Sequence, residues 1–193
     1  PINLHSLISL ISSFVSLKCL YTFSFVQILS KGTIGIHFIV LDEISWEHFL
    51  KERSKVITFN YEIEFALENE KQTSNWIEEI IAKEGFSLGE VNYIFCDDDY
   101  LHKINVEFLQ HDTYTDIISF DYTLGKLING DIYISIDRVK ENAVKYNTTF
   151  AEELHRVMIH GILHYVGYKD RTEEDKEEMR SKENSALFIL NNW

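Results

Sequence analysis

The fold of this chain is decided by one stretch, Thr149–Asp170, which reads TFAEELHRVMIHGILHYVGYKD. Its first residue, Thr149, and Glu152 have the spacing of a capping box, in which each side chain hydrogen-bonds the backbone amide of the other. Apolar residues then recur every three or four positions, as on the buried face of a helix. Gly167 is a typical residue to end a helix, because it adopts a left-handed conformation without strain. The stretch therefore predicts a long helix, closed by a turn that leads to Asp170.

Two histidines on this helix and one carboxylate after it have the spacing of metal ligands. His160 and His164 are four positions apart, which places both imidazoles on one helix face, one turn apart. Such a pair also occurs in satisfied cores, but Asp170 falls where it can supply a third ligand once the chain has turned at Gly167. Three protein ligands leave a fourth position for water, as in catalytic zinc sites, where the pKa of the water falls towards ~7. We therefore predict a hydrolytic centre with one Zn²⁺ per chain.

The spacing of these ligands also fits metzincin-type metalloproteases, which read His-Glu-x-x-His. Position 161 is Gly here, so the glutamate that would act as general base for peptide hydrolysis is missing. The sequence therefore disfavours proteolysis by that mechanism. A metalloprotease or another metal hydrolase with a remote base stays open as an alternative, and no general base can be assigned from the residues.

Alternating and helical patterns around this stretch predict an α+β fold. The order of elements from residue 56 is βαβαββααα, which indicates a mixed sheet of about four strands with helices packed against it and the metal-site helix near the C-terminus. The predicted strands are Ile57–Phe65, Glu90–Cys96, Asp116–Tyr122 and Asp131–Ile136. The predicted helices begin at Ser74, at Asp97–Asp99, at the cap Asp137, at Thr149 and at Thr172, and a loop marked by Gly125 and Gly130 joins the last two strands.

Residues 1–55 do not share this pattern and form a poorly assignable N-terminal extension. The apolar run Leu7–Leu17 lacks the basic start and the small-residue cleavage site of a secretory signal. A membrane span would carry Lys18 near its middle, which is costly, so we expect no stable membrane partner. The foldable pattern begins near Val56. We therefore interpret residues 1–55 as an upstream reading-frame extension that is not part of the native protein, with Val56 as the start, and residues 56–193 as the hydrolase domain.

The composition is that of a globular protein from a reducing compartment. The net charge is −13, almost all of it after residue 55, which argues against bulk attraction to nucleic acid. A local basic patch or a bound cation can still reverse the sign at one cleft. The two cysteines, Cys19 and Cys96, indicate neither a disulfide framework nor a Cys-based metal site. We therefore expect a cytoplasmic protein.

Three blocks of the chain resemble one family, the bacterial YbeY proteins. His160–Tyr168 (HGILHYVGY) is similar to that family's H-G-x-L-H-x-x-G-Y signature. Thr115–Phe120 (TDIISF) looks like its T-D-V-L-S-F block, and Gly130–Ser135 (GDIYIS) looks like its G-D-I-x-I-S/C segment. The blocks occur in the family's order, and the resemblance covers about residues 56–192. It implies a metal-dependent, single-strand-specific endoribonuclease that acts in 16S rRNA 3′-end maturation and ribosome quality control.

The chain departs from the family pattern at two positions that bear on the site. The family's third ligand is usually His, whereas Asp170 stands here; its negative charge makes a bound metal a weaker Lewis acid and favours a harder ion such as manganese. Leu109 occupies the position of an Arg that usually precedes the second block. His111, where a Lys often stands, can supply part of the lost positive charge if it is protonated, and so is a candidate catalytic residue. The alternative is a solvated loop histidine.

The resemblance also implies RNA partners, namely the 16S rRNA precursor, the small ribosomal subunit and its assembly factors. Basic side chains near the motif are candidates for RNA contact, although each can equally be an ordinary surface charge: Arg138, Lys140, Arg156, Lys169 and Arg171. We expect His155 to be structural, and Asp116 and Ser119 to shape the cleft rather than to react. A non-catalytic ribosome-assembly factor, whose metal holds the end of the helix in place, stays open as an alternative of a different class.

Overall fold

The computed structural model describes the backbone of residues 22–29 and 33–40 and the whole of residues 55–192. The chain forms two compact units, Pro1–Arg53 and Ser54–Trp193. In the first unit, β1 (Thr22–Leu29) and β2 (Thr33–Val40) pair as an antiparallel hairpin. The run 7–17 and residues 18 and 19, on which the signal and membrane interpretations depend, lie outside the described residues. Within the described ranges, no helix is long and apolar enough to span a bilayer.

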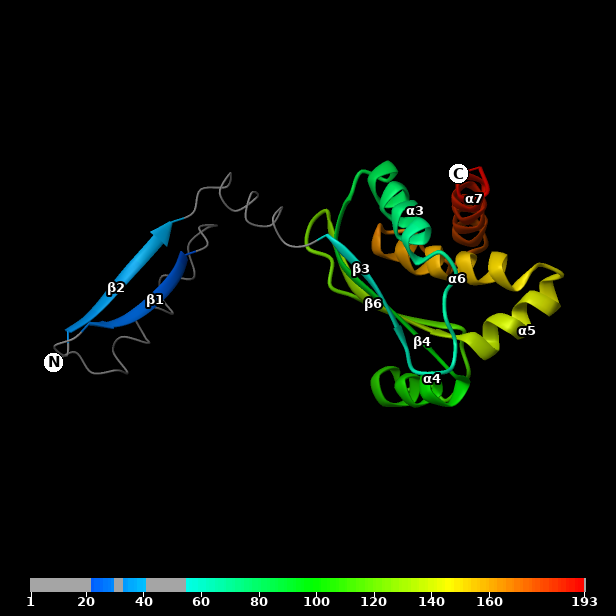
Figure 1. Ribbon diagram of the computed structural model, residues 1–193, viewed down its shortest axis with the longest axis horizontal. Coiled ribbons are helices and arrows are strands. Elements are labelled where there is room, and N and C mark those ends of the chain that lie inside the picture. Colours follow the sequence, from blue (N-terminus) through cyan, green and yellow to red (C-terminus); the bar gives the residue numbers. More distant parts are fainter. Residues whose placement is uncertain (1–21, 30–32, 41–54, 193) are drawn as a thin grey trace. The chain divides into compact units, whose positions relative to one another are not determined.

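The second unit is built on a four-stranded mixed sheet, as predicted. The sheet has the order β3-β4-β6-β5, in which β3, β4 and β6 run parallel and β5 pairs antiparallel with β6 at one edge. Figure 1 shows these strands crossing the unit side by side. Their bounds are β3 Val56–Tyr61, β4 Ser87–Cys96, β5 Ile117–Asp121 and β6 Leu127–Ser135.

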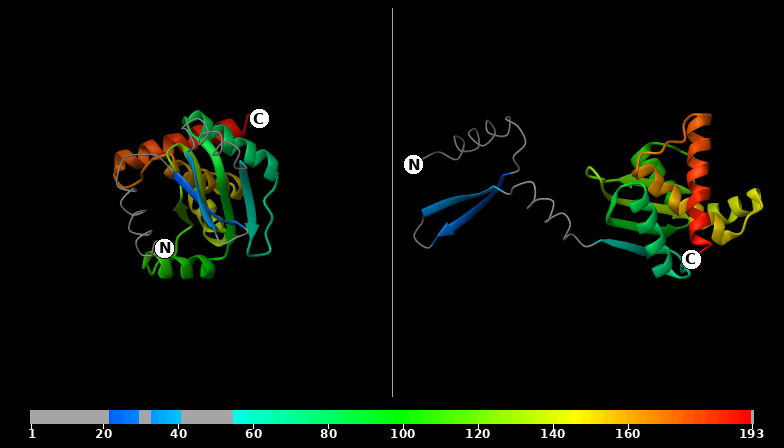
Figure 2. Two further views of the ribbon diagram at one scale, coloured as in Figure 1. Left: turned by 90° about the vertical axis from the view of Figure 1, so that its left-hand side faces the viewer. Right: turned by 90° about the horizontal axis from the view of Figure 1, so that it is seen from above.

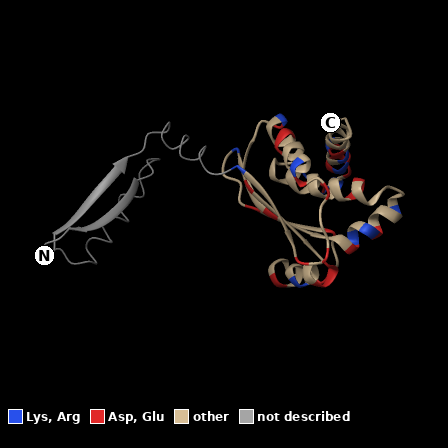
Figure 3. Cartoon of the chain, viewed as in Figure 1, with Lys and Arg blue, Asp and Glu red and all other residues tan. Residues whose placement is uncertain are grey.

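Helices cover both faces of this sheet, and the predicted α+β order is confirmed. The helices are α3 Glu70–Lys83, α4 Asp98–Ile104, a π-helical turn η1 Asn105–Leu109, α5 Ile136–Tyr146, α6 Phe150–Tyr165 and α7 Glu173–Leu190. The helices α3, α6 and α7 pack over one face, and α4 packs near the other (Figures 1 and 2). Acidic (red) and basic (blue) positions are mixed along α3, α5 and α7, and no helix drawn in Figure 3 is uniformly basic.

The core lies between the sheet and the three helices α3, α6 and α7. Tyr93 and Phe95 of β4 point into it on alternate positions and are fully buried, as is Trp76 of α3. Burying each such side chain stabilises the fold by roughly 1.5–3 kcal/mol. The indole of Trp76 also donates a hydrogen bond of 2.8 Å to the carbonyl of Ala186, which fixes α3 against α7. The position of α7 is therefore set by the core and not by surface contacts alone.

Several predicted boundaries are wrong. The helix α3 begins at Glu70 rather than at Ser74, and β4 begins at Ser87 rather than at Glu90. The first strand ends at Tyr61 rather than at residue 65. The N-cap of α5 is Ser135, whose hydroxyl accepts from the amide of Arg138, while Asp137 is already within the helix. Gly130 lies inside β6 and not in a loop. A Cβ at this position would come within 2.5 Å of the ring of Tyr165, so a close contact, and not a turn, explains the glycine. The glycine permits a close approach of α6 to the sheet rather than a turn.

The caps of α6 and α7 fix the turn between them. Thr149 accepts a hydrogen bond from the amide of Glu152, which is one half of the predicted capping box, while the Glu152 carboxylate contacts Arg156. Thr172 and Asp175 form a reciprocal capping box at the start of α7. Gly167 has a φ of 107°, a conformation that L side chains rarely adopt, and its amide donates to the carbonyl of His164. The chain therefore leaves α6 abruptly and enters α7 at a defined residue, which places residues 168–171 beside the last turn of α6.

Candidate metal centre

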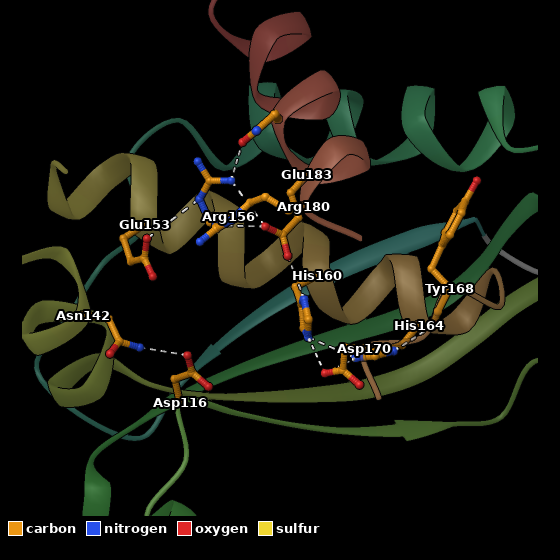
Figure 4. A network of polar contacts seen from close by, with 11 residues as sticks. Asp116, Asn142, Glu153, Arg156, His160, His164, Tyr168, Asp170, Arg180 and Glu183 are labelled. Atoms are coloured by element: carbon orange, nitrogen blue, oxygen red, sulfur yellow. Dashed lines mark hydrogen bonds and ion pairs between the residues drawn. The ribbon is translucent and has the colours of Figure 1, made fainter. Parts of the chain in front are cut away.

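His160, His164 and Asp170 come together at the end of α6 (Figure 4). The Nε2 atoms of the two histidines are 3.0 Å apart, and Oδ2 of Asp170 lies 3.8 Å from the first and 3.7 Å from the second. The three side chains are partly exposed, Asp170 most of all, at 49%. In the described part of the chain, this is the one group of three such residues whose ligand atoms could hold a metal ion.

The second nitrogen of each ring fixes which nitrogen carries the proton. His164 Nδ1 lies 2.9 Å from the carbonyl oxygen of Tyr168, which can only accept, so this nitrogen donates. His160 Nδ1 lies 2.9 Å from Oε1 of Glu183, which accepts when it is ionised. In both neutral rings the Nε2 atom is then left with a lone pair, and both lone pairs face the same point.

This arrangement fits a divalent metal ion. Two lone pairs facing each other at 3.0 Å repel unless a cation lies between them. Two nitrogens bound to a tetrahedral zinc at about 2.1 Å are about 3.4 Å apart, so a shift of a few tenths of an ångström would suffice. Asp170, at the next corner, is an oxygen ligand that zinc accepts, and it leaves a further position open to solvent.

Glu183 of α7, which the sequence reasoning missed, supports His160 from behind. The Glu183 side chain is buried, and its Oε2 atom accepts from Arg156 at 3.3 Å and from Arg180 at 3.1 Å. Burial would raise the pKa of this carboxyl, but the hydrogen bond with His160 and the neighbouring arginines hold it below the ordinary value. One signal was present in the sequence: Glu183 lies four positions from both Met179 and Leu187, on the apolar stripe of the helix, where an acid needs a partner.

Gly161 explains why the protease glutamate has no place here. A Cβ at this position would lie 3.0 Å from the Cδ1 atom of Ile132 and 3.1 Å from that of Ile117. The position therefore faces the sheet strands β5 and β6, and it is buried. A glutamate at this point would enter the core rather than reach a substrate, so the general base of the metzincin mechanism is excluded at position 161.

Leu109 and His111, where the resemblance predicts basic side chains, lie outside this cluster. His111 is exposed just after η1, where its backbone amide donates to the carbonyl of Asn105. Leu109 is the last residue of η1, and 43% of it is exposed. Neither belongs to the group formed by the two histidines and Asp170. The possible role of His111 therefore stays a prediction.

Two of the candidate RNA contacts are occupied by acidic partners inside the domain. Arg138 forms an ion pair of 2.7 Å with Asp98 and a second one with Glu141. Arg156, only 14% exposed, is held by Glu183 and other groups of α6 and α7. The remaining candidates are exposed: Lys140 on α5, and Lys169 and Arg171, which flank Asp170 in the chain.

The residues expected to be structural make internal contacts. The ring of His155 packs edge-on against Trp76 at 5.7 Å, and burial lowers its pKa, which favours the neutral ring. Asp116 accepts a hydrogen bond of 2.9 Å from Asn142, which ties the start of β5 to α5 (Figure 4). Ser119 is half-buried on β5, on the same side of the strand as Ile117.

The fold and the cluster together define a class: α+β proteins in which a helix beside a mixed sheet carries a candidate metal centre. Residues 56–191 match the family model described as Endoribonuclease YbeY, and the chain belongs to that family. This confirms the resemblance seen in the three sequence blocks.

Individual relatives agree with this assignment. The Endoribonuclease YbeY of Flavobacterium johnsoniae is 58% identical over 135 residues, which cover 70% of this chain and 97% of the relative. The Endoribonuclease YbeY of Cytophaga hutchinsonii is 48% identical over 141 residues, covering 72% and 98%. The solution structure of TM1509 from Thermotoga maritima matches with a TM-score of 0.52 and 29% identity, over 70% of this chain and 89% of that one.

Proposed function

We propose that this protein is a metal-dependent endoribonuclease that cleaves phosphodiester bonds in single-stranded RNA, with residues 56–193 as the catalytic domain. One observation carries the proposal: in a chain of a family named for endoribonuclease activity, the Nε2 atoms of two histidines and a carboxylate converge on one partly exposed point. Such a point is where a metal ion and a substrate phosphate can meet.

The proposal divides the residues of the site into metal ligands and groups that orient those ligands. His160, His164 and Asp170 would hold one Zn²⁺, which supplies Lewis-acid polarisation of a phosphoryl oxygen and an activated water. The backbone carbonyl of Tyr168 and the carboxylate of Glu183 keep the two rings in the orientation that the site needs. Asp170 offsets part of the charge of the ion, so manganese is an alternative occupant.

The RNA contacts and the cellular role follow from the family and from the charges left free. Lys169 and Arg171 are the basic side chains beside the site that we propose for phosphate contact, because Arg138 and Arg156 are paired within the domain. The acidic chain gives little general attraction to RNA, so we propose that the small ribosomal subunit and its assembly factors add affinity. We further propose a cytoplasmic role in 16S rRNA 3′-end maturation and ribosome quality control.

The test is RNA cleavage by the purified chain, with single-stranded and structured RNA as substrates. Activity should disappear with a chelator, return on adding Zn²⁺ or Mn²⁺, and be lost in His160→Ala and His164→Ala. His102→Ala, which changes a histidine outside the cluster, is the matched control and should retain activity. Cleavage that persists in both cluster variants would overturn the proposal. Metal binding without any cleavage would favour the assembly factor, and digestion of casein without RNA cleavage would favour a protease.

A further inference from the structure

Glu183, a buried carboxylate, joins the last helix to the candidate metal centre through a chain of partly buried polar contacts. Its Oε1 atom lies 2.9 Å from Nδ1 of His160, and its Oε2 atom accepts from Arg156 and Arg180. Only 7% of the Glu183 side chain is exposed. Both oxygens are therefore engaged, and the carboxylate cannot turn away from the imidazole without losing two charge-assisted hydrogen bonds.

We propose that Glu183 is a positioning residue for the metal centre: it sets the tautomer and the ring orientation of His160, so that α7 is a working part of a site whose ligands lie on α6 and in the following turn. The inference rests on the metal site proposed above. It gives α7 a role in metal affinity, although none of the three proposed ligands lies on that helix.

The two histidines are supported in different ways, which makes the inference specific to His160. The partner of His164 is a backbone carbonyl, a neutral acceptor that no side-chain substitution removes. The partner of His160 is a carboxylate, and a charged acceptor gives a stronger hydrogen bond and makes the opposite ring nitrogen a better metal donor. Metal affinity should therefore depend on the side chain at position 183.

The substitution Glu183→Gln keeps the shape of the side chain but places a hydrogen-bond donor, instead of an acceptor, opposite His160 Nδ1. The guanidinium groups of Arg156 and Arg180 can only donate, so the introduced amide turns its oxygen towards them. Its NH₂ group then faces His160 Nδ1, which must accept. The proton moves to Nε2, the atom that has to bind the metal.

The experiment compares Glu183→Gln with Glu177→Gln, which removes the same charge from an exposed position of the same helix. Zn²⁺ affinity is measured on the metal-free proteins by competition with a chromophoric chelator, and the tautomer of His160 by ¹⁵N NMR of the imidazoles. We expect Glu183→Gln to lower the affinity about 10- to 100-fold and to move the His160 proton from Nδ1 to Nε2. Glu177→Gln should leave both readouts unchanged.

Each contrary result has a distinct meaning. Wild-type affinity and an unmoved His160 proton in Glu183→Gln would overturn the inference, and so would an equal loss of affinity in both variants. The proposed site would survive either result as long as His160→Ala abolishes binding; if His160→Ala binds Zn²⁺ like the wild type, the site itself is wrong. If Glu183→Gln does not fold, Glu183→Asp keeps the charge but withdraws the oxygen by about 1.5 Å, and wild-type affinity there would also overturn the inference.

Discussion

His160 and His164 approach each other through their Nε2 atoms, at 3.0 Å, while the Nδ1 atom of each ring is held by an acceptor on the opposite side. When both rings are neutral, this hydrogen bonding leaves no proton on either Nε2 atom. The metal-free protein therefore already holds both Nε2 atoms in the orientation that a cation needs. Because α6, the turn after it and α7 fix this orientation, little conformational entropy is lost when a cation binds.

The third corner of this site can be tested at Asp170. Asp170→Ala should lower Zn²⁺ affinity by more than about 100-fold, since removal of a ligand should exceed the 10–100-fold effect of losing an outer partner. The free energy of unfolding of the metal-free protein should change by less than about 0.5 kcal/mol, because the side chain is half exposed. Metal content after dialysis and chelator competition provide the measurement. Asp170→His, which restores a ligand, is the control; equal metal content in wild type and Asp170→Ala would show that Asp170 is not a ligand.

The contact between Gly130 and Tyr165 should be a stability determinant. In Gly130→Ala the new methyl group would meet the Tyr165 ring and the carbonyl of Phe120 at 2.5–2.6 Å, and it would displace the Tyr165 hydroxyl from its hydrogen bonds to Phe120 and Asp131. We expect a loss of about 2–5 kcal/mol in the free energy of unfolding, measured by chemical denaturation.

A double-mutant cycle checks this cause. Combined with Tyr165→Phe, which removes the hydroxyl that the new methyl group displaces, Gly130→Ala should cost less than it does in the wild type. Strictly additive losses would show that the two side chains do not compete for the same space.

Converting the motif to that of a protease should fail. Gly161→Glu directs a carboxylate at Ile117 and Ile132 in the core, where it would be buried without a partner. We expect the variant to be destabilised by more than about 3 kcal/mol and to gain no peptidase activity. A thermal unfolding scan beside a casein assay measures both. A stable variant that digests casein would contradict the orientation of α6 described above.

Glu153 should make stability depend on pH in a predictable direction. It is 4% exposed, and burial raises its pKa, although Arg156 at 3.9 Å acts against this. Because the folded-state pKa lies above the unfolded value, the wild type loses stability as pH rises through the folded pKa. Glu153→Gln escapes this loss, so it should be more stable than the wild type at pH 7.5 by a margin that shrinks as pH falls through the folded pKa towards pH 4. Denaturation midpoints at both pH values test this, with the exposed Glu152→Gln as control; a margin that grows on acidification would contradict it.

Local signals explain why the ligands could be predicted from the sequence. The histidines and Asp170 lie within one helix and its following turn, and the caps at Thr149 and Thr172 are readable because capping acts over a few residues. The order of helices and strands along the chain and the family blocks followed from patterns of the same short range, whereas the order of strands within the sheet was not predicted. That these residues hold a metal stays a proposal.

Features that depend on the meeting of distant elements could not be predicted in the same way. The partner of His160 comes from α7. Asp98, which pairs with Arg138, and Glu183, which pairs with Arg156, also come from other helices, so a list of basic residues near the motif did not show which were already paired. Gly130 was assigned to a loop because glycine marks both turns and close approaches, and only the position of Tyr165 distinguishes the two.

The turn at Gly167 and the caps on either side of it confine the whole site, ligands and supporting groups alike, to the continuous segment between Glu152 and Glu183. The parallel sheet beneath must bring together strands that are far apart along the chain, which slows folding. The α6–turn–α7 hairpin needs no such long-range closure. If the proposed metal binds, its binding free energy would therefore stabilise this local segment directly, in addition to the role proposed for the ion in catalysis.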